Sequence, residues 1–201
     1  MEKTIVRCPA CIQGVLDIDR KEIEIPHFGE VMISTLMCGS CGYRSSDVIP
    51  LTARTPKKYK IKVDGPDKLS ARVVRSGTST VIIPELGARI DPGSFSEGFI
   101  TNVEGVLVRF RDILVQIKKE LSHAEQEEAI SDRISSFQDL LDRLEGIING
   151  GKFDEPITLV IEDPLGNSVI VSDEENVVLE EPLSDDEVLE LMNSDKGPQN
   201  E

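Results

Sequence analysis

The order of apolar and polar residues along the first fifty positions predicts β-structure. In LDIDRKEIEIP the apolar Ile23 and Ile25 alternate with acidic residues, and EVMISTLMC carries a second run directly into Cys38. Alternation with a period of two is the pattern of a strand that buries one face. Glycines at positions 14, 29, 39 and 42 separate these runs and mark the turns between them.

A second group of strands is predicted from residue 58 onward. KYKIKVD around 58–64, LSARVVRS around 69–76 and TSTVIIP around 78–84 are short runs bounded by turn residues. The pattern returns near the end of the chain, in ITLVIED (157–163) and SVIVSD (168–173). Between these last two runs, Pro164, Gly166 and Asn167 are typical of a turn that joins two antiparallel strands.

Residues 101–149 carry the period of an α-helix. The stretch TNVE from Thr101 reads as a capping box, and apolar residues then recur at spacings of three and four as far as Leu121. A second helix is predicted over about 124–148, with Gly150-Gly151 as its stop. Because the junction near position 122 is short, we expect an antiparallel helical hairpin. The predicted fold class is therefore mostly β with an α-helical hairpin (α+β).

Charge is distributed unevenly along the 201 residues, whose net charge is −15. Residues 173–201 hold eleven acidic residues and one lysine, so we expect an acidic, largely disordered tail. The exception is a short amphipathic helix that Ser184 and Glu187 would open. Residues Arg54–Arg75, here called the basic segment, hold eight basic and two acidic residues. The basic segment either faces solvent, binds phosphate or meets an acidic partner.

The composition fits a globular protein of one or two domains. Hydrophobic residues make up 39% and charged residues 29% of the chain. The longest apolar runs, TVIIP and ITLVI, are far shorter than the roughly 20 residues of a membrane-spanning helix. The N-terminus has no apolar leader and continues directly into Cys8. We therefore expect a cytoplasmic protein with no membrane partner, in which thiols stay reduced.

Four cysteines form two C-x-x-C pairs, Cys8/Cys11 and Cys38/Cys41, which are separated by 26 residues. Thiolates are soft ligands, and four of them in a tetrahedron suit Zn²⁺. The residues between the pairs are enough for a β-hairpin that brings the two turns together. We therefore predict one structural zinc ion held by all four cysteines. Zinc binding to such peptides contributes on the order of 10–16 kcal/mol, so we expect its removal to unfold residues 1–50 and leave the helices folded.

Other uses of cysteines at this spacing are less well supported by the sequence. A thioredoxin-like redox pair needs a helix start in a βαβ unit, which neither pair has. A rubredoxin-like iron site has similar sulfur geometry and stays open as an alternative. A catalytic zinc ion needs an open coordination position, which four sulfurs close. His27 lies between the pairs as a spare ligand, but with four sulfurs in place we expect it to pack or face solvent.

Sequence motifs of enzymes are missing. No Walker loop, nucleophile elbow or dinucleotide fingerprint occurs, and Glu162-Asp163 before Pro164 is interpreted as part of a turn rather than as a catalytic pair. We therefore predict a non-enzymatic protein with no catalytic residues and no small-molecule substrate. The chain divides into a zinc-ribbon finger at 1–52, a β-domain at 53–172 with the helical hairpin at about 101–149, and the acidic tail at 173–201.

Three stretches of the sequence resemble the ZPR-type zinc-finger proteins. IPHFGEVMISTLMCGSCGYRSSDV, preceded by C-x-x-C, resembles the finger of that family. RIDPGSFSEGFITNVEGVL resembles its turn followed by a Thr-x-x-Glu-Gly helix start, and ITLVIEDPLGNSVI resembles its I-x-D-P-x-G-N-S hairpin. The resemblance covers roughly residues 5–172, in the family's order. A single module is present, as in archaeal members, whereas eukaryotic members are similar to two modules in tandem.

The resemblance implies a fold and a partner. The fold is a zinc ribbon followed by a double-stranded β-helix-like domain with inserted helices, and the family's zinc ligands match the four cysteines. The implied function is binding of translation elongation factor 1-alpha as a folding chaperone or assembly factor. The alternative is a nucleic-acid-binding zinc ribbon that acts in translation or transcription through the basic segment. Few aromatic residues are available to stack on bases, so protein binding is favoured.

Overall fold

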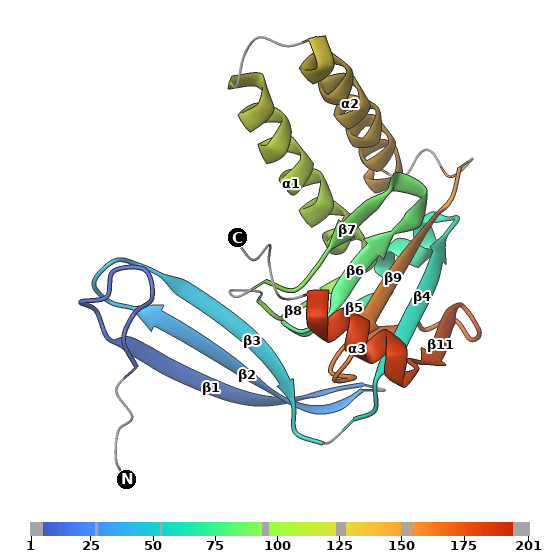
Figure 1. Ribbon diagram of the computed structural model, residues 1–201. Coiled ribbons are helices and arrows are strands. Elements are labelled where there is room, and N and C mark those ends of the chain that lie inside the picture. Colours follow the sequence, from blue (N-terminus) through green and yellow to red (C-terminus); the bar gives the residue numbers. More distant parts are fainter. Residues whose placement is uncertain are drawn as a thin grey trace.

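The computed structural model describes residues 6–26, 28–52, 54–93, 97–123, 128–149, 153 and 155–194, with the backbone alone at 121–123 and 128–134. Figure 1 shows three parts: a long β-arm at the N-terminus, a β-body, and a pair of helices that projects from the body. The fold class predicted from the sequence, mostly β with an α-helical hairpin, is confirmed.

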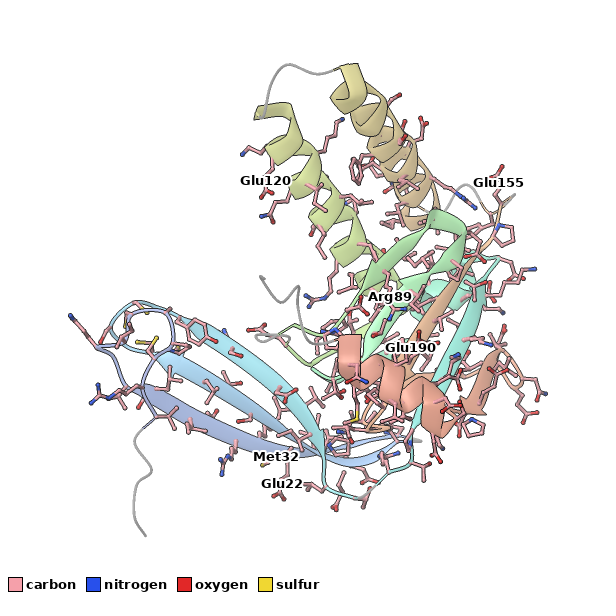
Figure 2. The ribbon with its side chains drawn as sticks, in the orientation of Figure 1. Glu22, Met32, Arg89, Glu120, Glu155 and Glu190 are labelled. Carbon is pink, nitrogen blue, oxygen red and sulfur yellow. The ribbon has the colours of Figure 1, made fainter. Side chains whose placement is uncertain are left out.

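The arm consists of β1 (Leu16–Ile25), β2 (Gly29–Cys38) and β3 (Arg44–Pro50), paired antiparallel in the order β1-β2-β3. The buried residues of the paired positions lie toward the two ends of the arm, with Leu16 and Cys38 at one end and Ile25, Val31 and Val48 at the other. Leu16 pairs with Cys38 at the distal end, and Ile25 pairs with Gly29 at the turn. Glu22 and Met32 face each other in the half of the arm nearer the body (Figure 2).

The body contains eight strands in two sheets within the described residues. One sheet has the order β10-β5-β8, and the other has the order β11-β4-β9-β6-β7. The strands are β4 (Lys57–Val63), β5 (Arg72–Arg75), β6 (Thr80–Ile83), β7 (Ala88–Ile90), β8 (Phe99–Asn102), β9 (Ile157–Asp163), β10 (Val169–Val171) and β11 (Val178–Pro182). Two short 3₁₀ helices, η1 (Pro66–Ser70) and η2 (Pro84–Leu86), occupy the start of one predicted strand and the end of another.

The turn after β9 corrects one prediction. β9 and β10 do not pair with each other, because they belong to different sheets. The buried Asp163 carboxylate stabilises this crossing by accepting hydrogen bonds from the hydroxyls of Ser76 (2.7 Å), Thr78 (3.0 Å) and Ser168 (2.6 Å). Ser76 follows β5 and Ser168 precedes β10, so one carboxylate ties the two sheets together. The segment is a corner between sheets and not a hairpin.

One apolar core joins all three parts of the molecule. Its fully buried members include Ile61, Leu107, Leu144 and Ile161, which come from both the body and the helices. The base of the arm contributes to the same core. These arm residues are Ile25, Phe28, Val31 and Val48. The arm is therefore anchored in the body by apolar packing at its proximal end.

The helices α1 (Val103–His123) and α2 (Glu128–Ile148) lie between β8 and β9 in the sequence and side by side in Figure 1. The start of α1 differs from the predicted capping box. Asn102 Oδ1 accepts a hydrogen bond from the Gly105 N–H (2.8 Å), whereas Thr101 pairs with Val73 as part of β8. Asn102 is thus the capping residue. The expected start of the second helix at 124–127 and its Gly150-Gly151 stop lie outside the described residues.

The prediction of a largely disordered tail is wrong for the part that the structure describes. β11 pairs with β4 along five residues, and α3 (Asp185–Ser194) follows it. As predicted, Ser184 and Glu187 form a capping box: Ser184 Oγ accepts from the Glu187 N–H (3.3 Å), and Glu187 Oε2 accepts from the Ser184 N–H (2.8 Å). Leu183 and Leu191 are buried, so this segment is docked on the body. None of the described helices is long and apolar enough to cross a membrane.

Candidate metal centre

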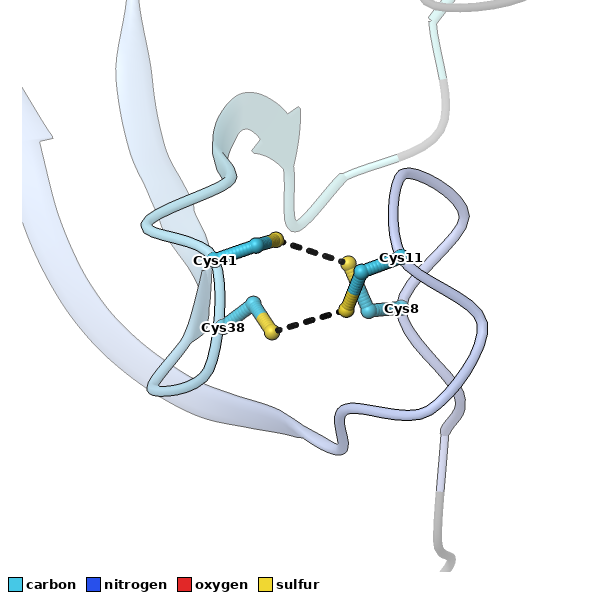
Figure 3. A group of neighbouring side chains, drawn as sticks. All are labelled: Cys8, Cys11, Cys38 and Cys41. Carbon is cyan, nitrogen blue, oxygen red and sulfur yellow. Dashed lines mark hydrogen bonds between the residues drawn. The ribbon is translucent and has the colours of Figure 1, made fainter.

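Two turns of matching geometry bring the cysteines together at the distal end of the arm (Figure 3). The Ile12 N–H donates to the Cys8 carbonyl (2.9 Å), and the Gly42 N–H donates to the Cys38 carbonyl (3.0 Å). Ile12 and Gly42, which follow the second cysteine of each pair, both have positive φ, of 60° and 75°. Glycine adopts this conformation freely, whereas a β-branched residue adopts it only under strain. The turn therefore holds Ile12 in a backbone conformation that its side chain disfavours.

The four sulfur atoms have the spacing of a tetrahedral thiolate site. All four lie within 4.8 Å of one another. Cys8 Sγ is 3.7 Å from Cys41 Sγ, and Cys11 Sγ is 3.8 Å from Cys38 Sγ. A tetrahedron with zinc–sulfur bonds of about 2.3 Å has sulfur–sulfur edges of about 3.8 Å. The structure therefore brings all four predicted residues to the distances that one zinc ion requires, with no sulfur out of reach.

The electrostatics of the cluster favour a bound cation. Backbone N–H groups of Cys41 and Ser40 lower the pKa of Cys38 to about 6. The pKa of Cys41 is instead raised to about 12, because desolvation and the three neighbouring sulfurs outweigh the lowering effect of the Tyr43 N–H. One thiolate thus forms easily, and each further negative charge is opposed by those already present. A divalent cation removes that opposition and holds all four sulfurs ionised.

The site is half-covered by packing, with Cys41 exposed, and its coordination shell is filled by the four sulfurs. Cys8, Leu16 and Cys38 are buried together, with Leu36 and Tyr43 packed against them. Such a shell of four sulfurs has no coordination position for water or substrate, which is the arrangement of a structural site. His27, which we expect to pack or face solvent and not to bind the metal, lies outside the described residues.

Gly14 is a further residue of the site, whose role in it is visible only in the structure. A Cβ atom at this position would lie 2.4 Å from Cys38 Sγ and 3.0 Å from Cys11 Sγ. The Gly14 carbonyl also accepts a hydrogen bond from the Cys8 N–H (2.8 Å). Gly14 therefore allows the backbone to approach the sulfurs.

The basic segment is largely neutralised within the molecule. The ion pairs are Lys57–Glu180 (2.5 Å), Lys58–Glu162 (2.7 Å), Lys58–Glu187 (3.0 Å), Lys60–Glu181 (2.7 Å), Lys62–Asp64 (3.7 Å), and Lys68 with both Asp67 and Glu174. Arg54 and Arg75 lie over the rings of Phe28 and Phe99. Arg72 is exposed. Five lysines are thus paired with carboxylates, and the segment offers no continuous basic surface for a phosphate backbone.

Comparison with known families agrees with both halves of this architecture. A family model described as the ZPR1 zinc-finger domain matches residues 2–53. A second, described as the ZPR1 jelly-roll domain, matches residues 67–185. The first match contains all four cysteines, which identifies the metal of the site as zinc. The second contains most of the body, whose eight strands in two sheets are typical of a jelly roll.

Individual relatives extend over most of the chain. A ZPR1-like protein of Methanocaldococcus jannaschii is 40% identical over 188 residues, which are 92% of this chain and 87% of that protein. A ZPR1-like protein of Pyrococcus horikoshii is 38% identical over 192 residues, 95% of this chain and 80% of that protein. The zinc finger chaperone of Schizosaccharomyces pombe is 32% identical over 165 residues, 81% of this chain and 34% of that protein. The archaeal proteins are thus similar over most of their length and the yeast protein over a third.

Proposed function

This chain belongs to the ZPR1 family, and from that premise we propose that it is a non-enzymatic protein that binds translation elongation factor 1-alpha as a folding chaperone or assembly factor. Cys8, Cys11, Cys38 and Cys41 are its proposed ligands for one structural zinc ion. We propose that the protein acts in the cytoplasm, where thiols stay reduced and available to the metal.

The observation that carries the proposal is the closed four-sulfur site at the tip of the arm. Because the metal position has no room for a substrate, the ion acts by holding the shape of the arm. The arm projects from the body and exposes Ile12 and Met37 close to the cysteines, with 69% and 50% of their surface accessible. We propose that these exposed apolar side chains, held by the metal-closed tip, contact the protein partner. The chaperone name of the S. pombe relative points in the same direction.

The alternative, a nucleic-acid-binding ribbon, loses its main support in this structure. It requires the basic segment to present its lysines to phosphates, and five of those lysines are engaged by carboxylates. Binding to nucleic acid would have to break these ion pairs before any phosphate is neutralised. We therefore keep protein binding as the proposed activity.

The proposal is tested by binding and refolding of the elongation factor. The zinc-loaded chain is immobilised and exposed to archaeal cytosolic extract, and captured proteins are identified by mass spectrometry. Elongation factor 1-alpha should be enriched, and enrichment should be lost with Cys41→Ser, in which the arm tip cannot close around the metal. Ser40→Ala, in the same turn, is the matched control. In a second assay, denatured elongation factor is diluted with and without the chain, and recovery of GDP binding is measured. A factor that is neither captured nor refolded in higher yield contradicts the proposal.

A further inference from the structure

A cavity of about 360 Å³ lies where α1 meets the body. This is within the range of sites that hold one large side chain or a small ligand. Residues from β5, β6, β7, β8 and α1 contribute to its wall. β8, which carries Phe99, lies between the arm and α1 in Figure 1. We call this site the α1 cavity.

The floor of the α1 cavity is apolar. Val81 and Ile90 contribute from the last two strands of the five-stranded sheet, and Val106, Phe110 and Ile113 contribute from α1. Ile113 keeps 42% of its surface accessible, although the helical pattern would bury it. An aliphatic or aromatic group that enters the cavity would therefore gain contact with carbon atoms and remove exposed apolar surface from water.

Two guanidinium groups lie over the Phe99 ring at the same cavity. Arg109 Cζ is 4.3 Å and Arg75 Cζ is 5.7 Å from the ring centre. Arg75 keeps only 5% of its surface accessible and donates to the carbonyls of Glu97 (2.9 Å) and Ser79 (2.9 Å). Its buried Nε has no hydrogen-bond partner among the described residues. A buried donor left without an acceptor is costly unless a ligand supplies one.

The positive charges of Arg75 and Arg109 are not neutralised by a nearby carboxylate among the described residues, so an anionic group could bind beside them. Burial lowers the pKa of Arg75, and the charge of Arg109 lowers it further, while Asp163 and Asp47 act against this from a distance. Neither arginine forms an ion pair within 4 Å among the residues that the structure describes. Two carboxylates stand at the wall of the cavity, those of Glu97 and Asp112. The Asp112 carboxylate is paired with Arg111 (2.7 Å) and not with Arg109. The Arg109 guanidinium is exposed, so it is the cation that a ligand can reach.

The edge strand beside the cavity favours an extended chain as the ligand. β7, which carries Ile90, is the last strand of its sheet and pairs only with β6 in the described part of the chain. An edge strand presents unpaired N–H and C=O groups that an incoming peptide can use. A peptide bound there would have its backbone held by β7 and alternate side chains available to the cavity.

We propose that the α1 cavity binds an extended segment of the client polypeptide in which an acidic side chain stands two residues from a large apolar one, so that both face the cavity. The apolar side chain occupies the floor made by Val106 and Phe110, and the carboxylate accepts hydrogen bonds from Arg109 at the rim. This inference rests on the proposed function, because it identifies the occupant as a segment of the elongation factor.

Methyl NMR of the full chain tests the site directly, with N-acetyl-Asp-Ala-Phe-amide as the probe, because Asp and Phe then lie on the same side of an extended peptide. The methyl signals of Val106, Ile113 and Ile90 should shift on titration. The same probe with Asn in place of Asp, or with Ala in place of Phe, should bind at least about tenfold more weakly, because each loses one of the two contacts. Signals that do not move, or that move equally with the Asn probe, overturn the inference.

Two variants separate the rim cation from general charge effects. Arg109→Gln removes an exposed cation at the cavity, and Lys119→Gln removes one farther along the same helix that does not line the cavity. Arg109→Gln should weaken probe binding about tenfold, the size of one lost charge-assisted hydrogen bond. Lys119→Gln should leave it unchanged. Equal effects of the two variants would count against a specific contact.

Competition with the elongation factor distinguishes this inference from the proposed function. Release of the probe when the unfolded factor is added supports the cavity as the client's docking site. Binding of the factor with the probe still in place overturns the inference and leaves the proposed function standing. A factor that does not bind at all overturns the proposed function, and with it the client as occupant.

Discussion

The arm and the C-terminal segment, residues 173–194, are both attached to the same body, but by different forces. The arm is attached to the body by four apolar residues at its base, and four sulfurs close its distal tip. The C-terminal segment is held by the pairing of β11 with β4, by four lysines of the basic segment, and by two buried leucines. Metal ligation and apolar burial are strong and insensitive to salt, whereas partly exposed ion pairs are weak and screened.

The difference teaches which part of the molecule can open without unfolding the rest. The middle of the arm buries little side-chain surface, so its stability comes from its two ends. The C-terminal segment covers an edge strand and can detach while the other four strands of that sheet remain paired. We therefore expect the arm to respond to loss of metal or core residues and the segment to respond to charge.

Removal of the metal should have the largest effect and should be confined to the distal half of the arm. The sequence alone predicts that all of residues 1–50 unfold on loss of the metal. Because Phe28, Val31 and Val48 belong to the core of the body, we now expect only residues 6–20 and 34–46 to lose protection. Zinc binding of such sites is worth on the order of 10–16 kcal/mol, so no other contact at the tip replaces it.

Hydrogen exchange of the full chain with and without a chelator measures this effect, and a metal-sensitive dye reports release of zinc. Cys38→Ser should reproduce the exchange pattern of the chelated protein, and Ser40→Ala should match the zinc-loaded one. Loss of protection that spreads into β4 or β9 would show that the arm and body are not separately anchored.

Phe28→Ala tests the other end of the arm. Phe28 is buried and lies under the Arg54 guanidinium, 3.8 Å from the ring centre to Cζ. Its removal should lower the free energy of unfolding by about 3–4 kcal/mol, the usual result of truncating a buried phenylalanine. Urea denaturation measures the change, and Ile49→Ala, at an exposed position of the arm, is the control. An unfolding free energy that stays the same in both variants would mean that the base of the arm contributes nothing to the core.

The metal site could be predicted from the sequence because its information is local. Each C-x-x-C pair specifies both the ligands and the turn that presents them, and four sulfurs define a tetrahedron without knowledge of the surrounding fold. The need for glycine at position 14 could not be predicted, because the atom that a Cβ would meet belongs to Cys38, in the other turn.

The start of α3 could be predicted from its capping box, but β11 and the docking of the C-terminal segment could not, because their partners are distant in the sequence. Lys57, Lys58 and Lys60 are separated from their carboxylate partners in this segment by 121 to 129 residues. Composition shows that opposite charges are present but not that β11 places them opposite β4. The prediction of a hairpin after β9 was wrong for a related reason, because the same turn residues occur in hairpins and in corners between sheets.

Lys58→Met should loosen the C-terminal segment without unfolding the body. Lys58 is largely buried and lies 2.7 Å from Glu162 and 3.0 Å from Glu187, which raise its pKa. Loss of these contacts should lower the free energy of opening of residues 178–194 by about 1 kcal/mol, a typical value for a partly exposed pair. Hydrogen exchange of β11 and α3 measures this. Lys62→Met, whose side chain is more exposed, should change exchange little. The difference between the variants should shrink at 1 M salt, and persistence of the full difference would contradict an electrostatic cause.

Acid should have the smallest effect and should act first on α3. The Ser184 N–H, the Lys58 ammonium and the Ser184 hydroxyl lower the pKa of Glu187 to about 2. A carboxylate whose pKa is lowered by folding stabilises the folded state above its ordinary pKa, and this contribution is lost as the pH falls toward the folded value. The start of α3 should therefore fray between about pH 4.5 and pH 2, which amide NMR of residues 185–188 would show as falling protection factors after correction for the intrinsic effect of pH on exchange. In Glu187→Gln the amide side chain cannot titrate, so the protection factors should be lower at neutral pH and nearly constant over that range. A pH dependence that survives in this variant would assign the loosening to other carboxylates of the C-terminal segment, and would show that its attachment to the body rests on their summed charge and not on the capping box.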